Sequence, residues 1–149
     1  MASKSTTLLT SQCCRGFSNQ LTEQQVAMQQ LCRKFAEEYL KPGAAKCDSD
    51  ARFPTNHVKK IANLGLMGAS VSEDYGGLDC DLLSIALCVE EFSRGCASTG
   101  MMVSIHNILY NDLIDKRGSD KLKKMFLCDF TKGSIGCFAL SEPGMFILY

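Results

Sequence analysis

Few side chains in this sequence have the type and spacing that catalysis requires. Two adjacent carboxylates, Glu90 and Glu91, could serve as a general acid and a general base. On a helix, neighbouring residues point about 100° apart, so the two cannot act on one substrate from the same face. The histidines, His57 and His106, lie far apart in the chain and complete no serine–histidine–carboxylate pattern. We therefore expect Glu90 and Glu91 to belong to a solvated or salt-bridged helix face.

Cysteine is the other reactive residue type, with nine copies in the chain. The sequence contains no Cys-x-x-Cys pair, and neither histidine lies near a cysteine pair at the spacing of zinc ligands. Several of the cysteines fall at apolar helix positions, where a free thiol packs like a small hydrophobic side chain. We expect no metal site, and reduced, mostly buried thiols in an intracellular protein.

Length and charge narrow the class of protein. A chain of 149 residues suits one domain that is large enough to bury a core. Basic and acidic residues number 16 each, so electrostatics give no reason to expect nucleic acid or an anionic membrane as a partner. No apolar run approaches the roughly 18 to 20 residues that a membrane span needs.

The first 21 residues differ in composition from the rest. They contain no acidic residue, they are rich in serine and threonine, and they carry Lys4 and Arg15. This composition predicts a mitochondrial transit peptide over residues 1–21, with cleavage after Phe17 in the sequence Arg15-Gly16-Phe17-Ser18. A mitochondrial matrix location follows from that prediction. The alternative is an ordinary disordered N-terminus.

Apolar residues that recur every three or four positions predict a bundle of about five helices. Thr22 followed by Gln25 has the pattern of a capping box and starts the first helix, which Pro42-Gly43 is expected to end. A strand is expected after the helices, over Ile135 to Leu140. The expected helices run from Thr22 to Pro42, from Thr55 to Leu64, from Leu82 to about Gly95, from Ala97 to Asp115 and from about Asp120 to Phe130.

The predicted fold class is therefore mainly α. A helical bundle over residues 22–133 is followed, in residues 134–149, by the first strand of a β-domain. A single strand cannot satisfy its own backbone groups, so it needs further strands to pair with. The last residues, Met145 to Tyr149, are apolar and uncharged. This composition is typical of a segment that sticks to other apolar surfaces when it is exposed to solvent.

Segments spread over nearly all of the chain after residue 21 resemble the acyl-CoA dehydrogenase family, and three of them carry most of the resemblance. Phe138-Ala139-Leu140-Ser141-Glu142-Pro143-Gly144 is similar to the strand and turn that contact the flavin in that family. Glu73-Asp74-Tyr75-Gly76-Gly77 resembles its loop before the third helix, and the stretch from Glu90 to Gly100 resembles the short-chain, butyryl-type members in particular. The resemblance implies an N-terminal helical domain, a middle β-domain and a C-terminal helical domain that builds a homotetramer.

The same resemblance implies an activity. It is the FAD-dependent α,β-dehydrogenation of a short-chain fatty acyl-CoA in β-oxidation, with electrons passed to electron-transfer flavoprotein. The residues expected to contact the cofactor are Phe138, Ala139, Leu140, Ser141, Glu142, Pro143 and Gly144. For Ser141, the alternative to cofactor contact is a purely structural role in a β-turn.

By resemblance, the third and fourth helices line the acyl pocket. The pocket residues expected on this basis are Met101, Val103, Ile105 and His106. For the methionines, ordinary core packing is an equally good interpretation. His106 stands where a small amide is expected in a short-chain member, so the preferred length of the acyl chain stays open.

The catalytic base of the family is a glutamate of the C-terminal domain, and no residue of this sequence matches it. We therefore expect the chain alone to fold as a helical bundle that neither retains FAD nor turns over substrate. Met145 to Tyr149 stand where the family continues with Gly-Ser-Asp, as in a splice product or an artefact of a gene model. The alternative function is a non-catalytic helical module that binds full-length subunits or is degraded.

Overall fold

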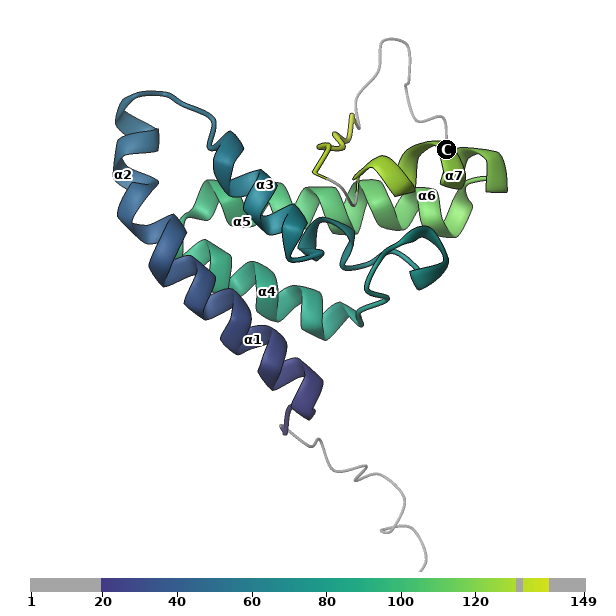
Figure 1. Ribbon diagram of the computed structural model, residues 1–149, viewed down its shortest axis with the longest axis horizontal. Coiled ribbons are helices and arrows are strands. Elements are labelled where there is room, and N and C mark those ends of the chain that lie inside the picture. The colour runs from purple at the N-terminus through teal and green to yellow at the C-terminus, as the bar shows by residue number, and fades with distance from the viewer. Residues whose placement is uncertain (1–19, 131–132, 140–149) are drawn as a thin grey trace, which may run out of the picture.

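The computed structural model describes residues 20–130 and 133–139, and helices build most of this part of the chain (Figure 1). Residues 1–19 of the predicted transit peptide and the apolar tail lie outside the described residues. Within the described part the helices join into five continuous segments, as predicted from the sequence. They are α1 (Glu23–Phe35), η1 (Ala36–Leu40) and α2 (Lys41–Ser49); α3 (Thr55–Asn63); α4 (Leu82–Gly95); α5 (Ala97–Ser104), η4 (Ile105–Asn111) and α6 (Asp112–Arg117); and α7 (Asp120–Phe130).

The first helical segment begins as predicted but ends later. The backbone N–H of Gln25 donates to Thr22 Oγ1 at 3.2 Å and the N–H of Thr22 donates to Gln25 Oε1 at 2.9 Å, which completes the capping box. The predicted end at Pro42-Gly43 is wrong, because the helix continues to Ser49. Before Pro42 the helix widens into the π-helical turn η1, in which the N–H of Lys41 donates to Ala36 O. Pro42 then lies in the first turn of α2, where a missing N–H is tolerated.

The core lies where α1, η1, α3, α4 and α5 meet. Phe35 of α1 and Phe92 of α4 pack with their ring centroids 5.5 Å apart and their planes tilted. Burial of such apolar side chains is the main stabilising contribution of the bundle. The buried cluster consists of Cys32, Phe35, Ala36, Leu40, Val58, Ile61, Ala62, Leu66, Met67, Cys88, Phe92 and Val103.

Helices α4 and α5 pack closely against each other after a sharp turn at Cys96 (Figure 1). A Cβ atom at Gly100 would overlap the Ser93 side chain, so glycine permits this close approach. The continuous run of small and apolar residues at the start of α5 thus places part of this helix inside the bundle, with Thr99, Gly100 and Val103 buried.

The connection from α3 to α4 folds back on itself. It contains two short 3₁₀ turns, η2 (Leu66–Gly68) and η3 (Glu73–Tyr75). Backbone bonds close the loop: the N–H of Leu78 donates to Gly68 O at 3.0 Å and that of Cys80 donates to Ala69 O at 2.8 Å. The loop therefore places the backbone of residues 66–70 against η4, where the polar contacts described below begin.

The predicted strand over Ile135 to Leu140 is not formed in residues 135–139, and Leu140 lies outside the described residues. Strand pairing needs a second strand, and the described part of the chain provides none. Residues 134–139 instead run as an irregular segment beside the bundle (Figure 1). None of the helices in the described residues has the length and apolar content that crossing a membrane requires.

Candidate functional site

The four residues predicted to line an acyl pocket differ widely in exposure. Met101 is 62% exposed, whereas Val103 is buried in the main core cluster. Ile105 is half-buried and His106 is completely buried. The structure therefore does not bring all four side chains to one surface, and their role as pocket residues stays a prediction.

The π-helical segment η4 buries three polar side chains: His106, Asn107 and Asn111. We call these three residues the polar seam. Each of them has 0% exposure, in a helix whose other residues include Ile105, Ile108 and Leu109. π-helical turns are rare and occur often at functional sites. Buried polar groups need hydrogen-bond partners, so the seam requires acceptors or donors from neighbouring segments.

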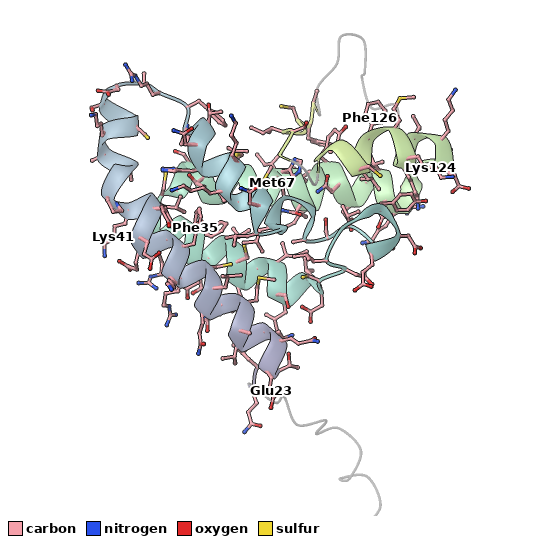
Figure 2. All side chains as sticks on the ribbon, viewed as in Figure 1. Glu23, Phe35, Lys41, Met67, Lys124 and Phe126 are labelled. Atoms are coloured by element: carbon pink, nitrogen blue, oxygen red, sulfur yellow. The ribbon has the colours of Figure 1, made fainter. Side chains whose placement is uncertain are left out.

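The two asparagines of the seam obtain these partners from the backbone of residues 66–70. Asn107 Nδ2 donates to Leu66 O at 3.0 Å and to Val103 O at 3.1 Å. Asn111 Nδ2 donates to Met67 O at 2.8 Å, and Ser70 Oγ donates to the carbonyl of Asn107 at 2.9 Å. Figure 2 shows Met67 in the middle of the bundle, so the seam attaches η4 to the centre of the molecule.

His106 makes the third connection of the seam, to a residue far along the chain. The backbone N–H of Gly136 donates to His106 Nδ1 at 2.9 Å. The imidazole ring is parallel to the Tyr110 ring, with 6.2 Å between centroids and an interplanar angle of 5°. Burial lowers the pKa of His106 to about 4, so the imidazole is neutral at pH 7 and Nδ1 can accept a hydrogen bond.

The predicted cofactor-binding segment is described only at its beginning. Phe138 is 40% exposed and Ala139 is also exposed. Leu140, Ser141, Glu142, Pro143 and Gly144 lie outside the described residues. Their predicted contact with a flavin therefore stays a prediction.

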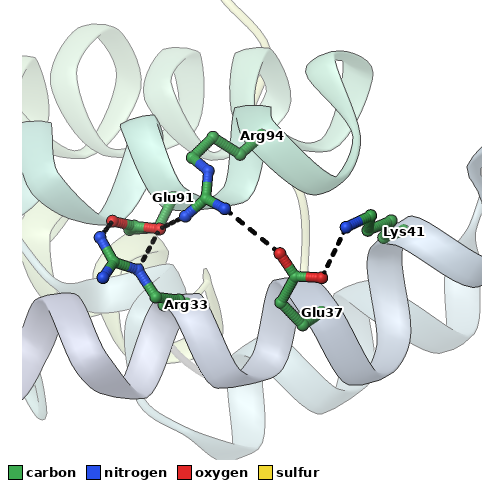
Figure 3. Close-up of polar contacts among 5 residues, drawn as sticks. All are labelled: Arg33, Glu37, Lys41, Glu91 and Arg94. Carbon is green, nitrogen blue, oxygen red and sulfur yellow. Dashed lines mark hydrogen bonds and ion pairs between the residues drawn. The ribbon is translucent and has the colours of Figure 1, made fainter.

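A charged cluster joins α1, η1, the first residue of α2 and α4 (Figure 3). The carboxylate of Glu91, 1% exposed, accepts from Arg33 Nε at 3.1 Å and from Arg94 Nη1 at 2.7 Å. Arg94 also reaches Glu37 at 3.2 Å, and Glu37 accepts from Lys41 at 2.8 Å. We call these five residues the charged cluster.

The carboxylate of Glu91 in the charged cluster is a weak base, because arginines occupy its oxygens. The hydrogen bond from Arg33, more than any other contact, lowers the pKa of Glu91, so the carboxylate stays ionised at neutral pH. Its neighbour Glu90 is exposed. The interpretation of Glu91 as a salt-bridged helix residue is confirmed. Its near-complete burial could not be foreseen from the sequence.

A cleft of about 360 Å³ lies between the α3–α4 connection, α4, η4 and α6. Its polar lining includes Ser70, Asp112, Asp115 and Lys116. The ammonium group of Lys116 lies 2.7 Å from Asp112 and that of Lys123 lies 3.5 Å from Asp115, so lysines already compensate these two carboxylates. In residues 20–130 and 133–139, no group of histidine, cysteine and acidic side chains has a geometry that could hold a metal ion.

Seven of the nine cysteines fall within the described residues, and all seven are free thiols. Cys32 and Cys88 are buried on α1 and α4, and Cys137 is exposed. The remaining four are half-buried. The expectation of mostly buried thiols is therefore wrong for this part of the chain, since three of the five others, Cys80, Cys96 and Cys137, lie outside the helices.

Sequence reasoning missed Asn107, Asn111 and Gly136 as members of the candidate site. A signal for the asparagines was available, because an amide within an apolar helix has to find buried partners. No comparable signal marked Gly136, whose partner His106 lies in a distant helix.

Comparison with known proteins supports a single family. The family model "Acyl-CoA dehydrogenase, N-terminal domain" matches residues 22–134. The mitochondrial short-chain specific acyl-CoA dehydrogenase of Rattus norvegicus is 47% identical over 128 residues, which cover 85% of this chain and 31% of the rat protein.

Two solved structures are similar in fold. Butyryl-CoA dehydrogenase from Megasphaera elsdenii has a TM-score of 0.78 and 29% identity, over 86% of this chain and 34% of the bacterial chain. A chain in the structure reported for the electron transferring flavoprotein of Acidaminococcus fermentans has a TM-score of 0.80 and 30% identity, with the same coverage of 86% and 34%. This chain thus spans about a third of the length of these relatives. It belongs to the acyl-CoA dehydrogenase family of oxidoreductases.

Proposed function

We propose that this chain provides the N-terminal helical part of a short-chain acyl-CoA dehydrogenase. The observation that carries the proposal is the 47% identity to the rat short-chain enzyme over 85% of the chain. The similarity of the bundle to butyryl-CoA dehydrogenase, with a TM-score of 0.78, supports it. The activity belongs to the complete enzyme, of which these residues correspond to about a third.

The proposed reaction is the removal of two hydrogens from a short-chain acyl-CoA thioester. A carboxylate base takes the proton from the α-carbon, and the hydrogen of the β-carbon leaves with its electron pair as hydride. When bound, FAD supplies the acceptor for that hydride, and electron-transfer flavoprotein then receives the electrons. In the described residues the most buried carboxylate is Glu91; two arginines occupy both of its oxygens and lower its pKa, which makes it a weak base, so we do not assign it the role of the base.

The residues of this chain proposed to contact FAD are those from Phe138 to Gly144. Their described beginning is compatible with a planar ring, because Phe138 and Ala139 are exposed on a segment without regular structure. Backbone N–H groups along a flavin stabilise the negative charge of its reduced form, and the same role is proposed for Ser141.

Met101 of α5 is exposed and Ile105 of η4 is half-buried, so both side chains are available to an acyl chain. Val103 and His106 are buried, so they would act on the pocket by packing beneath it. We propose a mitochondrial matrix location, supported by the name of the rat relative and by the composition of residues 1–21.

Capture of the native protein tests this proposal. An antibody against an exposed peptide of residues 41–53 would isolate from mitochondria every polypeptide that contains this bundle. We expect the captured material to carry FAD and to oxidise butyryl-CoA with electron-transfer flavoprotein or a dye as acceptor. Captured protein that contains peptides of this bundle, but neither flavin nor butyryl-CoA oxidation, would contradict the proposal.

The 149-residue polypeptide itself requires a separate experiment. We expect it to remain folded but to lose added FAD on gel filtration and to show no turnover of butyryl-CoA, because no residue in it matches the family's base. Retention of FAD in a one-to-one ratio would contradict this expectation.

A second function for the 149-residue polypeptide is association with full-length subunits. It is favoured by large apolar side chains that stay open to solvent, such as Leu82 at 68%, Met101 at 62% and Phe53 at 58%. Co-expression of a tagged 149-residue chain with a full-length short-chain enzyme would test it. Recovery of the tag in the tetramer fraction is the expected result, and a tag found only in monomeric or degraded material would exclude this function.

A further inference from the structure

We propose that His106, as a neutral imidazole, is a positioning residue that holds the backbone of Gly136 and so determines where the segment Phe138–Gly144 begins. The proposal rests on the proposed function of that segment in flavin contact. It differs from an acyl-pocket role for His106, because the side chain has 0% exposure and offers no surface to a substrate.

Gly136 is the point at which the irregular segment meets the bundle. Among residues 133–139 it alone is buried, between the exposed residues Ile135 and Cys137. Its N–H donates to His106 Nδ1 at 2.9 Å, a contact that joins residues 30 positions apart. The bundle thus holds this segment at one buried residue while the residues on either side stay open.

The aromatic ring beside His106 makes the same position sterically specific. A Cβ atom at residue 136 would overlap the Cγ atom of the Tyr110 ring, so only glycine can pack there. Tyr110 is itself parallel to the imidazole, with an interplanar angle of 5°. One hydrogen bond and one close packing contact therefore locate Gly136 on the bundle.

The direction of the hydrogen bond determines which form of the imidazole can act. Nδ1 accepts from an N–H, so it carries no proton, and the ring proton of the neutral form is on Nε2. A doubly protonated imidazolium has no acceptor and could not hold Gly136. Burial disfavours that charged form.

The consequence for the flavin segment follows from chain geometry. Phe138 lies two residues after Gly136, a span of roughly 7 Å in an extended chain. With Gly136 held, Phe138 can reach only positions within that distance of Gly136. The helical bundle thereby limits the placement of residues proposed to lie along a flavin ring.

The first measurement is made on the unmodified 149-residue chain. Nitrogen-15 NMR at pH 7 reports which imidazole nitrogen carries the proton, and a coupling across the hydrogen bond would identify Gly136 as the donor. We expect the Nε2–H tautomer of His106 with its Nδ1 coupled to the Gly136 amide. A proton on Nδ1, or an imidazolium, would overturn the proposal without any variant having to fold.

Two variants then test whether the acceptor is what matters. His106→Asn places an amide oxygen near the position of Nδ1, whereas His106→Leu places a methyl group there. We expect exchange of the Gly136 amide hydrogen to be at least about tenfold faster in His106→Leu and within about threefold of the unmodified chain in His106→Asn. The amide of Phe92, in the middle of α4, is the internal control and should not change.

Unchanged exchange at Gly136 in His106→Leu would overturn the proposal, and so would equal acceleration at Gly136 and Phe92, which indicates general destabilisation. These readouts need neither FAD nor substrate. A failure of butyryl-CoA oxidation would therefore refute the proposed function alone, whereas a failure at Gly136 would refute the positioning role alone.

Discussion

The charged cluster and the polar seam both connect distant parts of the bundle, but they do so with different chemistry. In the charged cluster, Glu91 is buried while the side chains of Arg33 and Arg94 are 51% and 50% exposed (Figure 3). In the seam, His106, Asn107 and Asn111 are neutral and have 0% exposure. One connection therefore stands at the border with water, and the other is removed from it.

This difference predicts different responses to change. Glu91 has two cationic partners, each of which can turn to water if the other is lost, so the cluster is redundant. A partner lost from the seam cannot be replaced by water, and the full desolvation cost of the remaining group is felt. The seam should therefore be the more sensitive connection, and four experiments can break or sharpen this comparison.

Acidification should have the largest effect, and it should act through His106. The pKa of this residue is about 4 in the folded chain and near 6.5 when unfolded, so the unfolded state binds the proton first. The contribution of neutral His106 to the free energy of unfolding is complete above pH 6.5. It decreases by about 3 kcal/mol as the pH falls from 6.5 through 4. Urea denaturation at pH 7, 6, 5 and 4 measures it.

His106→Asn is the matched control for acidification, because it removes the titrating group and keeps a polar side chain. Relative to His106→Asn, the unmodified chain should lose unfolding free energy steadily as the pH falls from 6.5 to 4. Parallel pH profiles would show that other groups dominate and that the seam is not the acid-sensitive connection.

Removal of a seam amide should have the next largest effect. Asn107→Ala removes two donated hydrogen bonds and leaves the carbonyls of Leu66 and Val103 buried without this donor. We expect a loss of about 2 to 3 kcal/mol in unfolding free energy, measured by urea denaturation at pH 7. Asn63→Ala, at an exposed asparagine, should change stability by less than about 0.5 kcal/mol, and equal losses in the two variants would contradict the comparison.

Neutralising the carboxylate of the charged cluster should cost less. Glu91→Gln keeps the shape and one acceptor oxygen but removes the charge that pairs with Arg33 and Arg94. We expect a loss of about 1 to 2 kcal/mol, with Glu90→Gln, an exposed neighbour, nearly neutral. A loss larger than that of Asn107→Ala would reverse the ranking of the two connections.

The outer pair of the cluster should contribute least. Lys41 and Glu37 are separated by one helical turn, and both are largely exposed. Lys41→Ala should shift the urea midpoint less than any other variant here, and the shift should vanish in 1 M salt because exposed pairs are screened. A shift that persists at high salt would show that the pair is coupled to the buried Glu91 through Arg94.

Much of the fold follows from local patterns. The predicted helices are present because their apolar spacing and the capping box at Thr22 act within a few residues of each other. The family resemblance also came from short segments, and the match over residues 22–134 confirms it. The end of the first helix was predicted wrongly, because the π-helical turn η1 places Pro42 where a proline is tolerated.

The site was predicted less well, for a reason that concerns sequence separation. The polar types of His106 and Asn107 are visible in the sequence, but their burial depends on residues 66–70 and on Gly136 arriving from elsewhere. The burial of Glu91 likewise depends on the packing of α1 beside α4, which brings Arg33 within 3.1 Å. A strand over Ile135 to Leu140 was expected from composition, but the described residues contain no strand to pair with it.

The amino-acid sequence by itself determined the helices, their first cap and the family, because these depend on neighbours along the chain. Tertiary structure alone decided which polar groups lost contact with water and which partners they obtained in exchange. Such a choice requires segments 30 to 58 residues apart to meet, as Gly136 meets His106 and as Arg33 meets Glu91. Burial and hydrogen bonding are properties of that meeting, and no local pattern can specify them.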